Sequence, residues 1–160
     1  MAIYLEYEGI KGNVTADGYK DHISVESVQF GVGRGITMEA GKMSNREASR
    51  PTLSEVTLTK SADNSVTSLF KEAVTGSAGK KVVIKFVRTG ADKVQEFMTY
   101  TLENCLVSSY NMSASSEGDP IESINLSFAK LMINYTDFDK TNKSGSPQRV
   151  GYDLETAKPL

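Results

Sequence analysis

Few residues in this chain are of types that perform chemistry, and the two most reactive of them occur once each. His22 is the only histidine and Cys105 the only cysteine. A structural zinc site needs several Cys or His ligands at short spacing, and catalytic cysteines lie in recognisable local signatures. Neither residue lies in such a pattern, although the residues alone leave a Cys–His pair open. We expect Cys105 to be a small buried apolar residue and His22 to be structural or exposed to solvent.

The glycines and carboxylates also lack the spacing that a binding site requires. Gly31, Gly33 and Gly35 form G-x-G-x-G, whereas a dinucleotide-binding turn needs G-x-G-x-x-G and a following helix. We interpret these glycines as the flexible or bulged end of a strand. The carboxylates are scattered, and Asp137 and Asp139 lie in a tail that also carries lysines. The sequence therefore predicts no catalytic residue, no metal site, no cofactor and no enzyme.

Charge and composition exclude further classes. The 18 Lys and Arg residues nearly balance the 20 Asp and Glu residues, which gives a net charge of −2. A nucleic-acid binder normally concentrates positive charge, so no nucleic acid is expected as a partner. No apolar run approaches the roughly 18 residues that cross a bilayer, so no membrane insertion is expected. The start of the chain has neither a basic region nor an apolar block, which predicts synthesis in the cytoplasm without a signal peptide.

Most of the chain alternates apolar and polar residues with period two, the pattern of half-buried strands. With 160 residues, we expect a single domain over 1–160. Strands are predicted at Ile3–Leu5, His22–Val32, Leu53–Lys60, Lys80–Arg88, Val94–Ser113, Ile121–Tyr135 and Val150–Leu154.

The alternation also predicts which side chains share a face. In three of the long strands we expect common faces formed by Val28, Phe30 and Val32; by Met98, Tyr100, Leu102 and Leu106; and by Ile124, Leu126, Phe128 and Met132.

One segment changes to the helical period. Val66, Leu69, Phe70 and Ala73 fall at i, i+3, i+4 and i+7, which predicts a helix over about residues 65–75 with these side chains buried. Candidate N-cap residues precede it at 63–65 and Gly76 follows it. Many antiparallel strands around one helix predict a mainly β protein, either a barrel or a sandwich.

Two regions lack periodicity. Residues 31–50 carry four glycines, and a loop of this length inside a compact domain is more often functional than idle. We expect an extended loop at about 33–50 and a polar C-terminal tail from about residue 136.

Along its whole length the chain resembles the haemolysin-coregulated protein (Hcp) family, the tube subunit of bacterial type VI secretion systems. The order and spacing of its motifs carry this resemblance. They are His22–Gly31, the Gly-rich loop that follows, Leu58–Lys60, Ser68–Ala73, Thr101–Tyr110, Glu117–Gly118, Pro120–Glu122, Asn125–Ala129 and Gly151–Leu154. The chain departs from the family where members often have Ser-Pro, here Ser65-Val66, and where they commonly have Trp, here Tyr152.

The resemblance implies a tail-tube-like antiparallel β-barrel of two sheets with one flanking helix. It implies a homohexameric ring, stacked into a tube that carries or chaperones effectors in its lumen. The implied partners are further copies of the chain and the sheath, spike and effector proteins of the type VI system. Export from the bacterial cytoplasm would use the type VI apparatus, which agrees with the missing signal peptide. The alternatives are a phage or tailocin tail-tube subunit and a monomeric ligand-binding β-barrel.

Ring formation assigns candidate roles to five residues. A ring needs head-to-tail contacts, and we expect Gly35–Arg50 to reach a neighbouring subunit or the next ring. The expected contact residues are Met38, Met43 and Arg46, because Met and Arg are enriched at interfaces. The alternative for this segment is an ordinary surface loop. Ser27 and Gln29 are expected to line the wet lumen, with the outer surface as the alternative.

Overall fold

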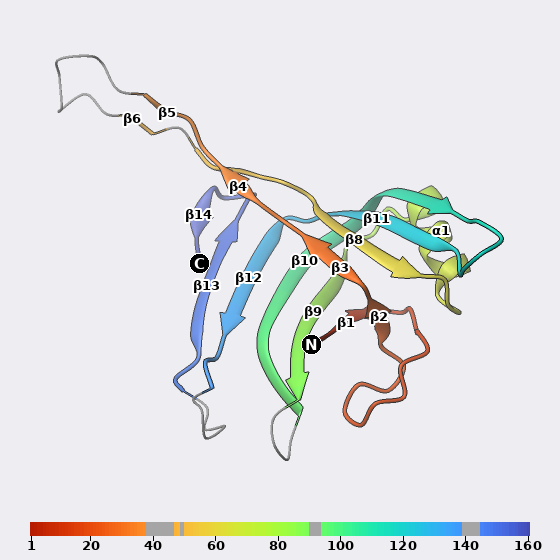
Figure 1. Ribbon diagram of the computed structural model, residues 1–160. Helices are drawn as coiled ribbons and strands as arrows, with labels where there is room; N and C mark the ends of the chain where they lie inside the picture. The colour runs from red at the N-terminus through yellow and green to blue at the C-terminus, as the bar shows by residue number, and fades with distance from the viewer. Residues whose placement is uncertain (38–46, 49, 90–93, 139–144) are drawn as a thin grey trace.

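The computed structural model describes residues 1–37, 47–48, 50–89, 94–138 and 145–160 (Figure 1). Two antiparallel sheets form a barrel, with one helix beside it, as predicted. The first sheet has the order β2 (Ile23–Val25), β1 (Ala2–Tyr7), β9 (Lys80–Thr89), β10 (Val94–Ser113), β12 (Lys130–Tyr135), β13 (Gln148–Asp153) and β14 (Lys158–Pro159). The second consists of β10, β11 (Ile121–Ser127), β8 (Val56–Ser61) and β3 (Ser27–Gln29).

Two segments run through both sheets and close the barrel. The first part of β10 pairs with β9 and β12, and its last part pairs with β11. On the other side, the chain passes directly from β2 in the first sheet to β3 in the second. Between these strands the Glu26 N–H donates to the Thr59 carbonyl oxygen at 2.8 Å. The sheets are therefore joined along both sides.

A bulge in β10 changes which of its side chains face the core. Asn104 has a φ of 54°, and the pairing with β9 shifts register between Leu102 and Cys105. Such a bulge moves the alternation by one position. Leu102 and Cys105 are buried while Leu106 is not, so the predicted position of Leu106 on the face of Leu102 is wrong.

The predicted strand over 121–135 is two strands with a break between Ser127 and Lys130. At this break the Ala129 N–H donates to the Glu103 carbonyl oxygen at 3.0 Å. The break also moves the alternation, so that Leu131 is buried where Met132 was expected.

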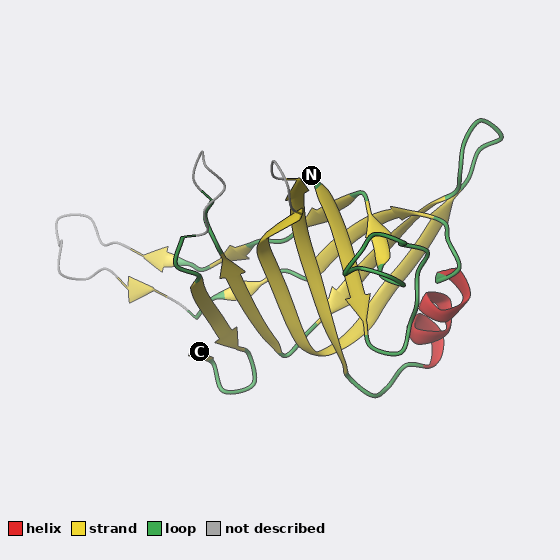
Figure 2. Cartoon of the chain, turned by 90° about the horizontal axis from the view of Figure 1, so that it is seen from below, coloured by secondary structure: helices red, strands yellow, loops and turns green. Residues whose placement is uncertain are grey.

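The predicted strand over 22–32 is also divided, because the chain passes from the first sheet to the second at Glu26 and leaves the barrel at Gly31. Val28 and Phe30 pack against the core, as their shared face predicts, whereas Val32 is 64% exposed. Beyond Gly31 the structure differs from the expected loop. It has β4 (Val32–Gly33) paired with β7 (Thr52–Leu53), and β5 (Ile36–Thr37) paired with β6 (Glu47–Ala48). We call these paired strands the arm, which projects from one end of the barrel (Figures 1 and 2).

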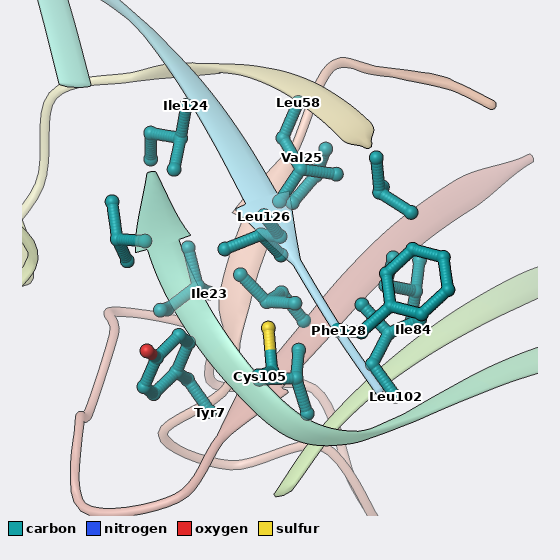
Figure 3. Packing of buried hydrophobic residues seen from close by; sticks show 14 of the residues in the cluster. Tyr7, Ile23, Val25, Leu58, Ile84, Leu102, Cys105, Ile124, Leu126 and Phe128 are labelled. Carbon is teal, nitrogen blue, oxygen red and sulfur yellow. The ribbon is translucent and has the colours of Figure 1, made fainter. Parts of the chain in front are cut away.

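Aliphatic and aromatic side chains from both sheets fill the barrel interior (Figure 3). Each large side chain taken out of water there contributes roughly 1.5–3 kcal/mol. Cys105 is completely buried among them, as expected of a small apolar residue, and burial raises the pKa of its thiol to about 12.

The helix α1 (Val66–Thr75) has the predicted bounds and lies at the end of the barrel opposite the arm (Figure 2). Only part of its predicted apolar face is buried. Leu69 is inaccessible to solvent, but Phe70 is 56% exposed, so its expected burial is wrong. Gly76 follows the helix as predicted, in an extended conformation with φ of −66°.

Candidate assembly surfaces

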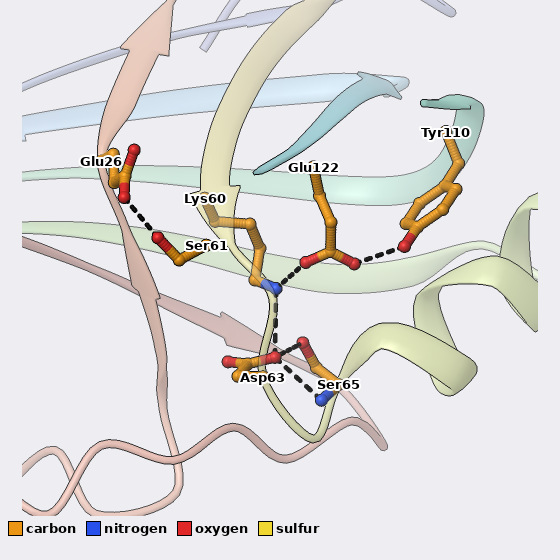
Figure 4. A network of polar contacts seen from close by, with 7 residues as sticks. All are labelled: Glu26, Lys60, Ser61, Asp63, Ser65, Tyr110 and Glu122. Carbon is orange, nitrogen blue, oxygen red and sulfur yellow. Dashed lines mark hydrogen bonds and ion pairs between the residues drawn. The ribbon is translucent and has the colours of Figure 1, made fainter. Parts of the chain in front are cut away.

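A buried polar network holds the helix end of the barrel together (Figure 4). Lys60, at the end of β8, is bound by the Glu122 carboxylate, and both side chains are inaccessible to solvent. Lys60 Nζ also donates to Asp63 Oδ1 at 3.0 Å, and the Tyr110 hydroxyl donates to Glu122. Burial, together with this contact to Glu122, raises the pKa of Tyr110. Buried charges are tolerated because they are paired and hydrogen-bonded.

The same network reaches the start of α1. Asp63 Oδ1 accepts the backbone N–H of Ser65 at 2.9 Å and also accepts its hydroxyl. Ser65 occupies the N-cap position, but its side chain makes no cap hydrogen bond with the helix. The turn before α1 is therefore fixed through Asp63 to the charged pair in the barrel.

A second polar cluster lies on the outside of β1 and β9 and includes His22. Lys85 Nζ donates to Glu6 Oε2 at 2.8 Å, and His22 Nε2 lies 3.6 Å from the same oxygen. The Tyr19 ring stacks on Tyr4 with centroids 4.8 Å apart. These contacts pack the segment before β2 onto the sheet. His22 is therefore placed among surface side chains, whereas Cys105 lies in the core, and the structure does not bring the two together.

The arm and its base expose apolar side chains. Val32 on β4 and Ile36 on β5 are 64% and 47% exposed. All three expected contact residues, Met38, Met43 and Arg46, lie outside the described residues, and their role stays a prediction.

An apolar groove of about 270 Å³ lies between the base of the arm and the edge of the first sheet. We call it the arm groove. Its lining includes Phe30, Val32, Leu53, Ile133 and Val150. Val150 is 59% exposed. The sequence pattern does not predict this surface, because it combines β4, β7, β12, β13 and β14, which lie far apart in the chain.

Ser27 and Gln29 are both exposed on β3, on the side of the second sheet that faces away from the core. The Ser27 hydroxyl contacts the Thr59 hydroxyl on β8, while Val28 between them packs against the core. Their polar face is where the alternation predicts it, and its position in a lumen stays a prediction.

The described residues contain no group of three or more His, Cys, Asp or Glu side chains placed to hold a metal ion. Within the same part of the chain, no helix is long and apolar enough to cross a membrane.

This architecture, a two-sheet antiparallel barrel with a flanking helix and a projecting arm, defines a known structural class. The chain is similar to a type six secretion system protein of known structure, with 26% identity and a TM-score of 0.92. The match covers 99% of this chain and 99% of that protein. Hcp1 from Salmonella typhimurium matches 99% of this chain over 98% of its own, with 20% identity and a TM-score of 0.77. A type VI secretion system effector from Yersinia pestis matches 94% of this chain over 98% of its own, with 20% identity and a TM-score of 0.73.

The sequence itself identifies the family. The family model described as "Type VI secretion system effector, Hcp" matches residues 4–135. A search of curated proteins finds no match. The chain belongs to the Hcp family of the type VI secretion system, as its motifs predict. Membership supports a role as a tube subunit and implies secretion through the type VI system.

Proposed function

We propose that this chain is the inner-tube subunit of a type VI secretion system, and that it forms homohexameric rings which stack into a hollow tube. The observation that carries the proposal is the arm, because it projects from an Hcp-type barrel with apolar side chains exposed along it. In this proposal residues 1–160 act as a single domain with a structural and not an enzymatic role.

The exposed surfaces support ring formation. Rings that close by rotation use different surfaces on the two sides of each subunit. The arm supplies one such surface, with Val32 and Ile36 exposed. Met38, Met43 and Arg46 would extend the same contact surface toward a neighbouring subunit or the next ring.

Effector transport is the second part of the proposal. Ser27 and Gln29 would face a wet lumen, because the exposed face of β3 presents polar side chains that need no burial. Effectors would be held or chaperoned there, with the sheath around the tube and the spike at its tip. The chain would be made in the bacterial cytoplasm and leave through the type VI apparatus.

The interior of the barrel argues against a monomeric ligand-binding protein. The side chains from both sheets that point inward are buried against one another, including Leu58, Ile84, Leu102 and Leu126 (Figure 3). A ligand-binding barrel keeps an interior cavity for its ligand, and here the centre is filled.

Light scattering and electron microscopy of the same purified peak test the proposal. A six-fold subunit mass with annular particles is the expected result. A monomer that persists over a wide range of concentrations would overturn it.

A further inference from the structure

The helix α1 carries more apolar surface than the barrel covers. Phe70 is 56% exposed and Val74, one turn later, is 64% exposed. We call these two side chains the helix ridge. The Phe70 ring contacts the Tyr110 ring edge-on, with centroids 6.0 Å apart, so one side of the ridge rests on β10. Its other side faces solvent.

The helix ridge and the arm groove suit each other in shape and chemistry. The groove is concave and lined almost wholly by apolar side chains, whereas the ridge is a pair of side chains standing out from a helix. Burying exposed apolar surface is favourable by about 25 cal/mol per Å². Large apolar side chains inserted into a partner's pocket are also the usual centres of protein interfaces.

The two surfaces lie at opposite ends of the molecule. Figures 1 and 2 both show α1 at one end of the barrel and the arm at the other. The ridge therefore cannot fill the groove of its own chain. A second copy can fill it, and repetition of that contact gives a head-to-tail arrangement, which closes into a ring when the rotation between copies permits closure.

Exposed charges of opposite sign lie near the two surfaces, in addition to Lys71 beside the ridge and Glu155 in the turn between β13 and β14. The turn between β10 and β11, at the helix end, exposes Glu117 and Asp119. At the groove end, the exposed Arg34 and Arg149 adjoin the lining residues Val32 and Val150 along the chain. Exposed charges attract over about 8–10 Å at physiological ionic strength. The docked arrangement would place the acidic turn of one copy near the basic residues of the next.

We propose that the helix ridge of one subunit docks in the arm groove of a second copy of this chain. This inference rests on the proposed ring and names the contact that closes it.

Cross-linking tests the contact directly in the assembled protein. A chain with both Val74→Cys and Val150→Cys is treated with a short bismaleimide, and each single variant is the control. The native Cys105 does not compete because it is buried and the pKa of its thiol is raised to about 12. We expect a ladder of covalent multimers up to the hexamer from the double variant and none from either single variant.

The mass of the same sample, measured by light scattering, separates the two hypotheses. Particles of six-fold subunit mass without the ladder of covalent multimers would overturn the docking but not the proposed function. Six-fold particles with a ladder from Ile36→Cys and Val150→Cys instead would show that a neighbour's arm fills the groove, which also overturns it. A monomer in every variant and in the unmodified chain would overturn both.

A charge in the ridge provides an independent readout. Val74→Asp should raise the subunit concentration needed for ring formation at least about ten-fold, because docking would bury an unpaired carboxylate in an apolar groove. Val94→Asp is the matched control, since Val94 is similarly exposed, at 53%, and lies at the start of β10 away from α1 and the arm (Figure 1). Equal effects of the two substitutions would contradict the docking.

Discussion

The two ends of the barrel differ in how their side chains are covered or paired within the subunit. At the helix end, the Lys60 and Glu122 charges are paired inside one subunit and reinforced by Asp63 and Tyr110. At the arm end, Val32 and Val150 are left exposed around an apolar groove. The polar network at the first end contributes to the stability of the monomer, whereas the groove at the second end leaves apolar surface uncovered. Stability and assembly are therefore expected to depend on different residues.

Removing the outer part of the arm, which includes β5 and β6, should separate stability from assembly most clearly. Replacing residues 35–50 with a short Gly-Ser turn keeps the hydrogen bonds between Gly31 and Ser54 at its base. We expect complete loss of rings by light scattering with an unchanged thermal unfolding midpoint. Rings that persist would show that this part of the arm is not needed for assembly, and a chain that no longer folds would show that the two ends are not independent.

Breaking the buried ion pair should have the opposite effect. Lys60→Met removes the ammonium group and leaves the Glu122 carboxylate buried without its partner. We expect the free energy of unfolding, measured in urea, to fall by about 3–5 kcal/mol.

The double variant Lys60→Met with Glu122→Leu is the control for this prediction. Because it removes the buried Glu122 carboxylate, and Asp63 keeps its hydrogen bonds from Ser65, it should recover part of the lost stability. A single variant as stable as the unmodified chain would contradict the role given to the network.

Removing the Tyr110 hydroxyl group tests the contribution of one hydrogen bond to the network. Tyr110→Phe keeps the ring that contacts Phe70 but removes the hydrogen bond to Glu122. The free energy of unfolding should fall by about 1–2 kcal/mol, while ring formation is unchanged. Tyr135→Phe, at an exposed position, is the control and should change stability by less than about 0.5 kcal/mol.

The smallest expected effect lies on the outer surface of the first sheet. The hydrogen bond from Lys85 lowers the pKa of Glu6 below its ordinary value of 4.5. A carboxyl group with a lowered pKa stabilises the fold above its ordinary pKa, and this contribution is lost as the pH falls through the lowered value. Glu6→Gln should therefore be slightly less stable than the unmodified chain at pH 7, and the two should converge as the pH falls through the lowered pKa of Glu6.

Asp17→Asn, which removes an exposed carboxylate from the preceding segment, is the control for Glu6. Urea titrations across the pH range make the comparison. A difference between Glu6→Gln and the unmodified chain that grows in acid would show that the stated cause of the pKa shift is wrong.

Alternation and helical periodicity predicted most of the elements, because both arise from neighbouring residues. The shifts that decide the faces of Leu106 and Met132 were not predictable in this way. One follows from the bulge at Asn104, where the pairing of β10 with β9 changes register, and Gly79 is the only hint of it. A side chain at Gly79 would collide with Asn104.

Assembly surfaces were harder to predict than the core. A periodic apolar pattern predicts that a side chain is shielded from water, but it does not distinguish shielding by the same chain from shielding by a partner. For this reason Phe70 was expected in the core. The arm groove brings together segments from residue 30 to residue 159, a combination that only the strand order reveals. The exposure of Ser27 and Gln29 could be predicted because polar alternation is local, whereas their position in a lumen stays a prediction.

The position of β1 has a consequence for synthesis of the chain. β1 lies between β2 and β9, with Ile3 opposite Val25 on one side and Phe86 on the other. On the ribosome it can meet β2 early, but its second neighbour emerges only some sixty residues later. During that interval one edge of the nascent hairpin is open, and open edges are templates for pairing with other chains. The edge of β1 therefore stays open to such pairing until β9 has been translated.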